Sequence, residues 1–266
     1  MRARGRLLGC AAAALCAIAP HVASAWDIDR YAELLAQHTR AADDLAGTRV
    51  DYAALDRDPG WHELLASLDA ATPPADDAPR GERLAFWIDA YNVLAMNVVV
   101  THRPIASIRD AGSLLWPVWK RPAGRVGGRE RTLDEIEHGI LRPIGDPRIH
   151  MAIVCASTSC PSLAREPYRA ASIDAGLDAA AARFVADRAK GVRVEGRSVR
   201  LSRIFDWFAA DFATGGGVLA FVGRYADPAL RSELAALGPD PPLAWFDYDW
   251  SLNGVRRDDD ETMPLR

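Results

Sequence analysis

The chain has 266 residues, of which 49% are hydrophobic and 26% charged, with 32 basic and 36 acidic residues. Acidic and apolar residues in these ordinary proportions indicate one globular domain with a sizeable core. The basic residues are scattered and form no patch in the sequence, which argues against a nucleic-acid partner.

The first 25 residues have the three regions of a secretory signal peptide. A segment with three arginines precedes a short apolar run from Leu7 to Ala19, and Ala23-Ser24-Ala25 is a small-x-small cleavage signal. The run is too short and too rich in alanine to suit a membrane span. Cleavage near Ala25 predicts a periplasmic or secreted protein whose mature chain has no transmembrane segment. The alternative is a lipoprotein modified at Cys10, but almost no apolar core precedes that cysteine.

Removal of this segment changes both the cysteine count and the charge. Cys10 and Cys16 leave with it, so the mature chain keeps only Cys155 and Cys160. The segment also contains three arginines and no acid, which leaves 29 basic and 36 acidic residues and a net charge of −7. An exported protein with two cysteines is a candidate for a disulfide, because the periplasm is oxidising.

Apolar residues at helical spacing predict amphipathic helices over residues 26–42 and 61–68. A loop rich in proline and aspartate follows, and then the segment RLAFWIDAYNVLAMNVVVTHRP, which is apolar nearly all round. We expect it to form a central buried helix. Its Asp89 and Asn92 share a face, and buried polar groups need hydrogen-bond partners. They either tie the helix to neighbouring backbone or orient a group in a site.

The second half begins with another helix and a strand. Thr132 and Glu135 form a capping box for the predicted helix LDEIEHGILR, which presents Glu137 and His138. The apolar segment Ile149–Val154 is predicted to be a short strand.

Further helices are expected over residues 173–189, RIFDWFAADF and GVLAFVGRY, with a hairpin in VRVEGRSVRLS and a last strand in LAWFDYDWSLN. The aromatic residues of these segments are interpreted as core and sheet residues, some of which line a pocket. The predicted fold class is α+β, with several helices on a small, mainly antiparallel sheet. One domain covers residues 26–254, and residues 255–266 form a loose tail.

Four segments in order resemble the signature blocks of domain-of-unknown-function family 547: FWIDAYNVL, LDEIEHGILR, HMAIVCASTSCPSL and LSRIFDWFAADF. The resemblance covers Phe86–Phe212 and implies an exported bacterial protein whose chemistry is unassigned. Two positions depart from the family pattern, which usually has asparagine at the positions of Asp89 and Val154. Asp89 adds a carboxylate, and Val154 removes a polar group beside the cysteine that a site in relatives could use.

The segment Cys155–Cys160, called the cysteine turn below, admits a disulfide. The bridge can close if the four residues between turn back, because bridged Cα atoms lie about 4.4–6.8 Å apart. So short a loop would rigidify the turn more than it would stabilise the whole domain.

A second chemistry for the cysteine turn is nucleophilic catalysis by Cys155, which requires a base within hydrogen-bond reach. An extended strand would place His150 roughly 16 Å from Cys155. His138 on the preceding helix is therefore the predicted base, and Asp89 is the predicted orienting carboxylate.

Metal and serine chemistry fit less well. Cys155, Cys160, His138 and His150 supply soft ligands, but their spacing departs from that of common zinc sites, so no metal or other cofactor is predicted. Ser157 lacks the G-x-S-x-G context of a nucleophilic serine and is expected to bond turn backbone.

Two functions stay open. The first is a non-catalytic periplasmic binding or envelope-associated module with a disulfide-locked turn, whose partner is a small molecule or an envelope component. The second is a cysteine-dependent hydrolase or acyltransferase acting on amide, ester or thioester bonds. The catalytic set would be Cys155, His138 and Asp89, and the binding set would be Asn92, Glu137, His150, Ser157 and Cys160.

Overall fold

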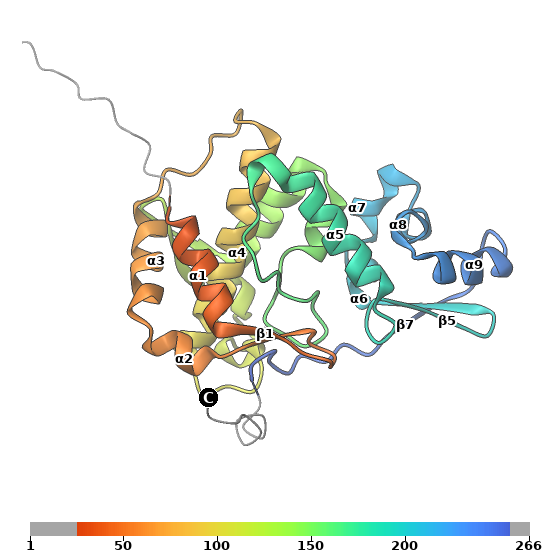
Figure 1. The fold of residues 1–266 in the computed structure, drawn as a ribbon, viewed down its shortest axis with the longest axis horizontal. Helices are drawn as coiled ribbons and strands as arrows, with labels where there is room; N and C mark the ends of the chain where they lie inside the picture. Colours follow the sequence, from red (N-terminus) through yellow and green to blue (C-terminus); the bar gives the residue numbers. More distant parts are fainter. Residues whose placement is uncertain (1–25, 256–266) are drawn as a thin grey trace, which may run out of the picture.

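The computed structural model describes residues 26–255. The predicted signal peptide lies outside the described residues, as does the predicted tail except for Val255. Helix α4 (Arg80–His102) runs through the centre of the larger lobe (Figure 1). Most of its residues are buried, as its uniformly apolar sequence predicts. Within residues 26–255, α4 is the one helix long and apolar enough to span a membrane, and 83% of its most apolar window is buried in the fold.

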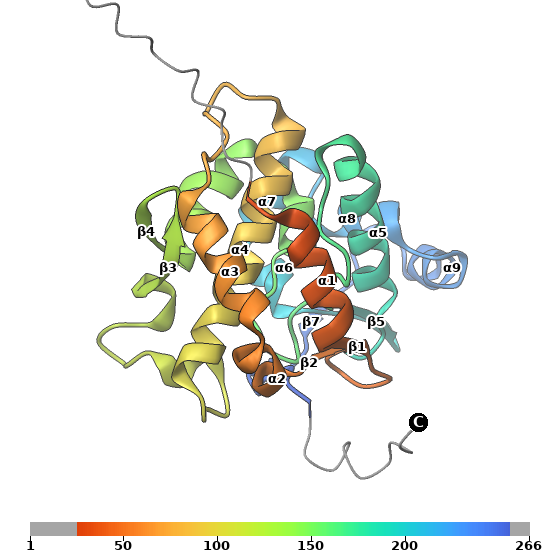
Figure 2. The ribbon, with the colours of Figure 1, turned by 60° about the vertical axis from the view of Figure 1, so that its left-hand side comes forward.

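Three helices cover one side of α4 (Figure 2): α1 (Ile28–His38), α2 (Tyr52–Arg57) and α3 (Pro59–Ala70). Each begins after an aspartate whose side chain accepts a backbone N–H of the first turn. The predicted helix over residues 26–42 ends early, at His38. The reason is that β1 (Thr39–Ala41) leaves the helix to pair with β2 (Thr48–Val50).

The chain then leaves α4 through two short 3₁₀ helices, η1 (Ile108–Ala111) and η2 (Val118–Lys120), and enters the hairpin of β3 (Pro122–Val126) and β4 (Arg129–Thr132). The next segment, η3 (Glu135–Leu141), is a π-helix. Half of the predicted capping box is present, because the hydroxyl of Thr132 accepts the N–H of Glu135 at 3.0 Å. The side chain of Glu135 pairs with Arg131.

The prediction of a strand over Ile149–Val154 is wrong. After the short η4 (Arg142–Ile144), the chain forms the 3₁₀ helix η5 (Pro147–Met151). Asp146 caps η5 by accepting the N–H of Arg148, and Pro147 supplies a backbone angle suited to a first helical residue. Ile149 and Met151 are buried in this helical turn, and Ile153 and Val154 are buried in the irregular segment that follows it. An apolar run this short suits a buried helical turn as well as a strand.

The smaller lobe begins with η6 (Ala170–Ser172) and α5 (Ile173–Ala186). It continues with β5 (Val192–Glu195), β6 (Ser198–Leu201), α6 (Arg203–Trp207), α7 (Ala209–Phe212), η7 (Ala213–Gly215), α8 (Val218–Tyr225), α9 (Pro228–Leu237) and β7 (Leu243–Trp245). Strand β6 pairs antiparallel with β5 and parallel with β7. The predicted α+β class is confirmed, although the strands form separate small sheets.

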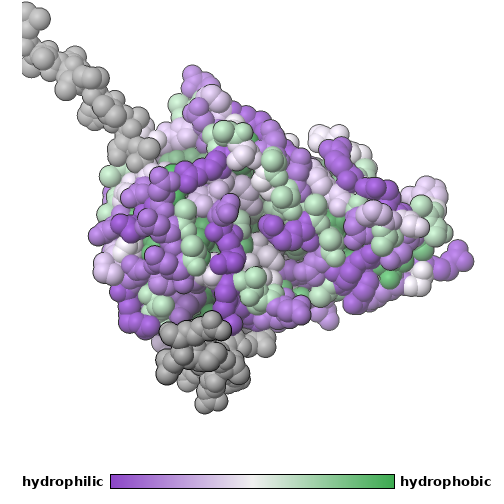
Figure 3. Space-filling view, in the orientation of Figure 1, coloured by the Kyte–Doolittle hydropathy of each residue, from purple (hydrophilic) through white to green (hydrophobic). Residues whose placement is uncertain are grey.

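After β7 the chain runs back in extended form along the larger lobe. The N–H of Leu252 donates to the carbonyl of Ala106, and the N–H of Val255 donates to that of Val50. The predicted last strand is therefore confined to residues 243–245. The buried apolar residues form two clusters, one around α4 and one among α5–α8 and the β5–β6 hairpin. Hydrophilic residues cover much of the face seen in Figure 3.

Candidate ligand-binding site

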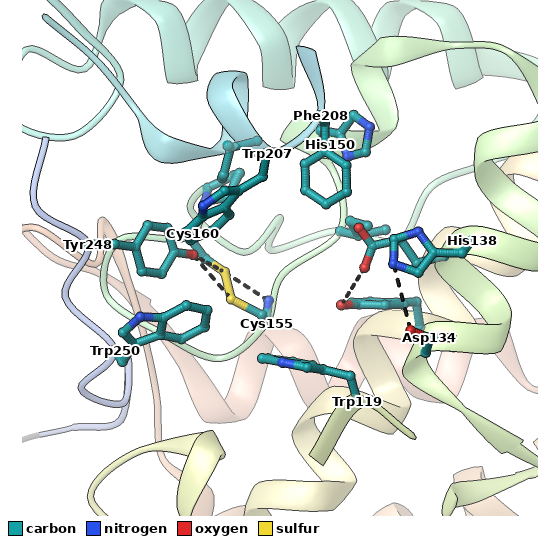
Figure 4. A pocket seen from close by; sticks show the side chains of 15 residues that line it. Trp119, Asp134, His138, His150, Cys155, Cys160, Trp207, Phe208, Tyr248 and Trp250 are labelled. Atoms are coloured by element: carbon teal, nitrogen blue, oxygen red, sulfur yellow. Dashed lines mark hydrogen bonds and ion pairs between the residues drawn. A yellow bond between two sulfur atoms is a disulfide. The ribbon is translucent and has the colours of Figure 1, made fainter. Parts of the chain in front are cut away.

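A pocket of about 180 Å³ lies between the two apolar clusters. Its residues come from α4, η2, η3, η5, the cysteine turn, α6 and the extended segment after β7. Figure 4 shows aromatic rings and the cysteine turn on one side of the pocket, and His138 with Asp134 on the other. Part of it was expected from the sequence, since Glu137, His138, His150, Cys155 and Cys160 all line it.

Four aromatic side chains, Trp119, Trp207, Tyr248 and Trp250, form what we call the aromatic wall. The Tyr248 ring lies 4.8 Å from that of Trp207 and 4.4 Å from that of Trp250, between ring centroids. Trp119 adds to this group at 6.0 Å from Trp250. Aromatic rings at such spacings hold one another in place, so the wall is formed before any ligand arrives.

Cys155 and Cys160 form a disulfide, with their Cα atoms 6.2 Å apart. The cysteine turn is a bridged loop in this structure, which is one of the alternatives that the sequence left open. Ala156 adopts a left-handed backbone with φ of 59° inside the loop, and its carbonyl accepts the N–H of Asn253. The C-terminal segment therefore braces the turn.

The hydroxyl of Tyr248 lies above the disulfide. It is 3.2 Å from Sγ of Cys160 and 3.3 Å from Sγ of Cys155. Ser157 donates its hydroxyl to the oxygen of Tyr248 at 3.2 Å, which directs the tyrosine proton toward sulfur. Burial raises the pKa of Tyr248, so this hydroxyl stays protonated and acts as a donor.

Lys190 is buried behind the cysteine turn. Its ammonium group donates to the carbonyls of Ala46 and Thr158 at 3.2 Å each and to that of Cys160 at 2.7 Å. Burial lowers the pKa of Lys190 to about 8. No local sequence pattern indicates this role, because Lys190 is a single cation 30 residues from the cysteine that it holds.

The opposite side of the pocket carries carboxyl groups. The hydroxyl of Tyr91 donates to Oε2 of Glu137 at 3.3 Å, and burial raises the pKa of Glu137 to about 7. His138 is exposed at the rim, with Nδ1 2.9 Å from a guanidinium nitrogen of Arg142 and Nε2 3.8 Å from Asp134. Because arginine can only donate, Nδ1 accepts, and a neutral His138 carries its proton on Nε2, toward Asp134.

His150 is buried and stacks on Phe208, with ring centroids 4.0 Å apart. Its Nε2 lies 2.8 Å from a carboxylate oxygen of Asp211. Burial lowers the pKa of His150 to about 4, so the ring is neutral and Nε2–H is the donor. Its Nδ1 is then an acceptor, and it has no partner within the described part of the chain.

Three predicted site residues, Asp89, Asn92 and Ser157, do not line the pocket. Asp89 is buried, and its carboxylate accepts the N–H of Tyr168 at 2.9 Å, so it does not orient His138 as the sequence suggested. The carboxylate that pairs with His138 is Asp134, one turn away on the same helical segment.

Asn92 also stands behind the pocket. Its side-chain oxygen accepts the N–H of Val154 at 2.8 Å, and its nitrogen donates to the carbonyl of Ala152 at 3.0 Å. It therefore fixes the backbone that leads into Cys155, the first of the two roles that its burial suggested. Ser157 contacts Tyr248 as well as Sγ of Cys155, so it positions the aromatic wall rather than only the turn backbone.

A known protein family matches the middle of the chain. Residues 75–185 match a family model described as protein of unknown function, DUF547. The predicted resemblance is confirmed. The DUF547 match covers α4, η3 and the cysteine turn, whereas Trp207, Tyr248 and Trp250 come from beyond it. No curated protein and no solved structure matches the chain.

The side chains that could hold a metal are not gathered for it. In residues 26–255, no group of three or more histidine, cysteine, aspartate or glutamate side chains is arranged to bind a metal ion. The chemistry available in the pocket is that of aromatic faces, carboxyl groups, two histidines and a disulfide.

Proposed function

We propose that the chain is an exported, non-catalytic binding module that takes a small organic cation in this pocket. One observation carries the proposal: the aromatic wall and the carboxyl groups of Asp134 and Glu137 line the same cavity. Of the described residues that line it, none is lysine or arginine.

Electron-rich ring faces attract a cation electrostatically, most strongly when it is removed from water. A carboxylate in the same cavity adds a Coulombic attraction that the low local dielectric strengthens. His150 adds no positive charge, because its pKa lies near 4. The cavity volume is below the roughly 300–1,000 Å³ typical of drug-sized ligands, which favours a small headgroup such as a quaternary ammonium.

Export is the second part of the proposal. It rests on the basic, apolar and small-residue regions of the first 25 residues, and a disulfide at the cysteine turn suits an oxidising compartment. Cell fractionation with N-terminal sequencing tests it. A mature protein that begins at Trp26 in the periplasm is the expected result, and an uncleaved cytoplasmic chain would contradict it.

Ligand binding is tested by tryptophan fluorescence, since three wall residues are tryptophans. The probes are choline and its uncharged carbon isostere, 3,3-dimethyl-1-butanol. We expect choline to bind at least about tenfold more tightly, because a desolvated cation–π contact contributes about 2 kcal/mol. Trp250→Leu should weaken choline binding. Trp61→Leu is not a suitable control, because Trp61 lies in the core. Equal affinity for the two probes would contradict a cation site.

The alternative, a cysteine-dependent hydrolase or acyltransferase, is favoured by one fact: Cys155 and His138 line the same pocket. It requires the disulfide to be reduced first, because a bonded sulfur is not a nucleophile. Reduced protein that releases p-nitrophenol from p-nitrophenyl acetate in a Cys155-dependent way, unlike the Cys155→Ser variant, would support this function over the binding module.

A further inference from the structure

The two sulfurs of the disulfide differ in access. Cys155 is partly exposed, whereas Cys160 is 3% exposed, although both contribute to the pocket wall. A thiol that enters the pocket therefore meets Sγ of Cys155 more readily. Thiol–disulfide exchange depends on which sulfur is accessible to the attacking thiolate and on how easily the other sulfur leaves.

Both sulfurs face hydroxyl groups, Sγ of Cys155 those of Tyr248 and Ser157, but the backbone N–H in this turn is directed at Sγ of Cys160. Sγ of Cys160 accepts the backbone N–H of Cys155 at 3.0 Å and faces the hydroxyl of Tyr248 at 3.2 Å. The ammonium of Lys190 adds positive charge nearby, since it is bonded to the carbonyl of Cys160 itself. Such donors would stabilise negative charge on Cys160 as the bond breaks.

The turn keeps other attachments that do not depend on the bridge. The N–H of Thr158 donates to the carbonyl of Ser251 at 2.8 Å, and the N–H of Ser159 donates to that of Asp249 at 3.2 Å. Lys190 holds two further carbonyls of the turn. The cysteine turn can therefore keep its shape when the sulfur–sulfur bond is open.

We infer that the Cys155–Cys160 disulfide undergoes thiol–disulfide exchange with a low-molecular-weight thiol that enters the pocket. The thiolate attacks Sγ of Cys155 and forms a new sulfur–sulfur bond. The old bond breaks, and its electron pair goes to Sγ of Cys160. A second thiol then attacks the mixed disulfide, releases the symmetric small disulfide and frees Cys155. Two small thiols are oxidised, the protein disulfide is reduced, and the two protons lost by the thiols match those gained by the two cysteines.

The charge of the preferred thiol rests on the proposed function. Each exchange rate is divided by the rate of the same thiol with cystine, which removes differences in intrinsic reactivity. If the pocket favours cations, cysteamine should react faster than 2-mercaptoethanol, and the anion 2-mercaptoethanesulfonate should react slowest. Exchange without this ranking would contradict the cation site and leave the exchange inference standing. Choline binding without exchange would do the reverse.

The test uses the purified, oxidised protein. Cysteamine is added at pH 8, the reaction is stopped with N-ethylmaleimide, and the peptides are mapped by mass spectrometry. We expect cysteamine on Cys155 and the maleimide on Cys160, with the opposite arrangement at least about tenfold rarer, because attack requires access to sulfur. Cysteamine mainly on Cys160 would overturn the inference. So would a disulfide that is reduced only after the protein is unfolded in urea.

A hydroxyl-deletion variant tests the stabilisation of the leaving sulfur. Tyr248→Phe keeps the aromatic ring and removes the donor, so exchange should slow about tenfold, the usual effect of losing one hydrogen bond to a charged group. The control is Tyr225→Phe, which removes a hydroxyl that donates to Asp178 at 2.7 Å, between α8 and α5 in the smaller lobe. Equal rates for the two variants would contradict the role of Tyr248. Thermal unfolding midpoints of both variants separate this effect from a loss of folding.

Discussion

The carboxylate of Asp211 receives two hydrogen bonds of 2.7 Å from the guanidinium of Arg142. It receives a third, of 2.8 Å, from Nε2 of His150. Asp211 lies on α7 in the smaller lobe, whereas Arg142 and His150 lie on η4 and η5. One carboxylate thus joins α7 to the segment that carries Arg142 and His150, and the hydrogen bonds from Arg142 lower its pKa and keep it ionised.

Removing this carboxylate should destabilise the fold. Asp211→Ala leaves a guanidinium and a buried imidazole without their acceptor, so we expect a loss of about 2 kcal/mol in the free energy of unfolding, given the partial exposure of the pair. Urea denaturation measures it. The control is Asp206→Ala, which breaks an exposed pair with Arg203 and should cost less than about 1 kcal/mol. Similar losses in both variants would contradict a linking role for Asp211.

Asn92 should matter more than the other asparagine of α4. Asn92→Ala leaves the N–H of Val154 and the carbonyl of Ala152 unpaired in the core, at an expected cost of about 2–4 kcal/mol. Asn97→Ala removes one bond, to the carbonyl of Ala123 at 2.8 Å, and should cost about half as much. Urea denaturation of the two variants under one set of conditions makes the comparison. A larger loss for Asn97→Ala would contradict the bracing role of Asn92.

The sequence predicts much of this fold because its signals are local. The apolar run of α4, the capping threonine of η3 and the hairpin around Gly196 each contain the residues that determine them. The segment Ile149–Val154 does not. Four to six apolar residues suit a strand or a buried helical turn equally, and here the cap at Asp146 and the partner Asn92 decide.

The candidate site shows the same limit. The helix and cysteine turn that resemble the family supply Glu137, His138 and Cys155, and all three line the pocket. Tyr248 reaches it through an extended segment about 90 residues away, and no local pattern gives that distance. The predicted pairing of His138 with Asp89 is wrong for a related reason. The position of Asp89 on one face of α4 does not show which neighbouring segment packs against that face.

The disulfide should contribute modestly to stability. In the chain-entropy model a loop this short adds about 2 kcal/mol, and the turn keeps its bonds to the C-terminal segment and to Lys190. We therefore expect the double variant Cys155→Ser with Cys160→Ser to fold, with an unfolding free energy lower by about that amount. Circular dichroism and urea denaturation measure both. Loss of the fold would show that the bridge does more than close a short loop.

Glu137 should make stability fall as the pH rises. Its pKa is about 7 in the fold, against an ordinary value of 4.5, because burial disfavours the charged form. Between these values the folded protein keeps a proton that the unfolded chain has released, so stability is highest below pH 4.5 and is lost as the pH rises toward 7. At about 1.4 kcal/mol for each unit of pKa shift, the loss is at most about 3–4 kcal/mol.

The matched variant is Glu137→Gln, which keeps the shape of the side chain and cannot titrate. The unfolding free energy of the unaltered protein minus that of the variant should decrease from pH 4.5 to 7 and stay level above pH 7. The same ionisation should strengthen choline binding, because the carboxylate attracts the cation: we expect about tenfold tighter binding at pH 8 than at pH 6, and no such change in Glu137→Gln. A stability difference that does not vary with pH would contradict the raised pKa. A stability difference that follows the expected course, with choline affinity equal at both pH values, would place the bound cation away from Glu137.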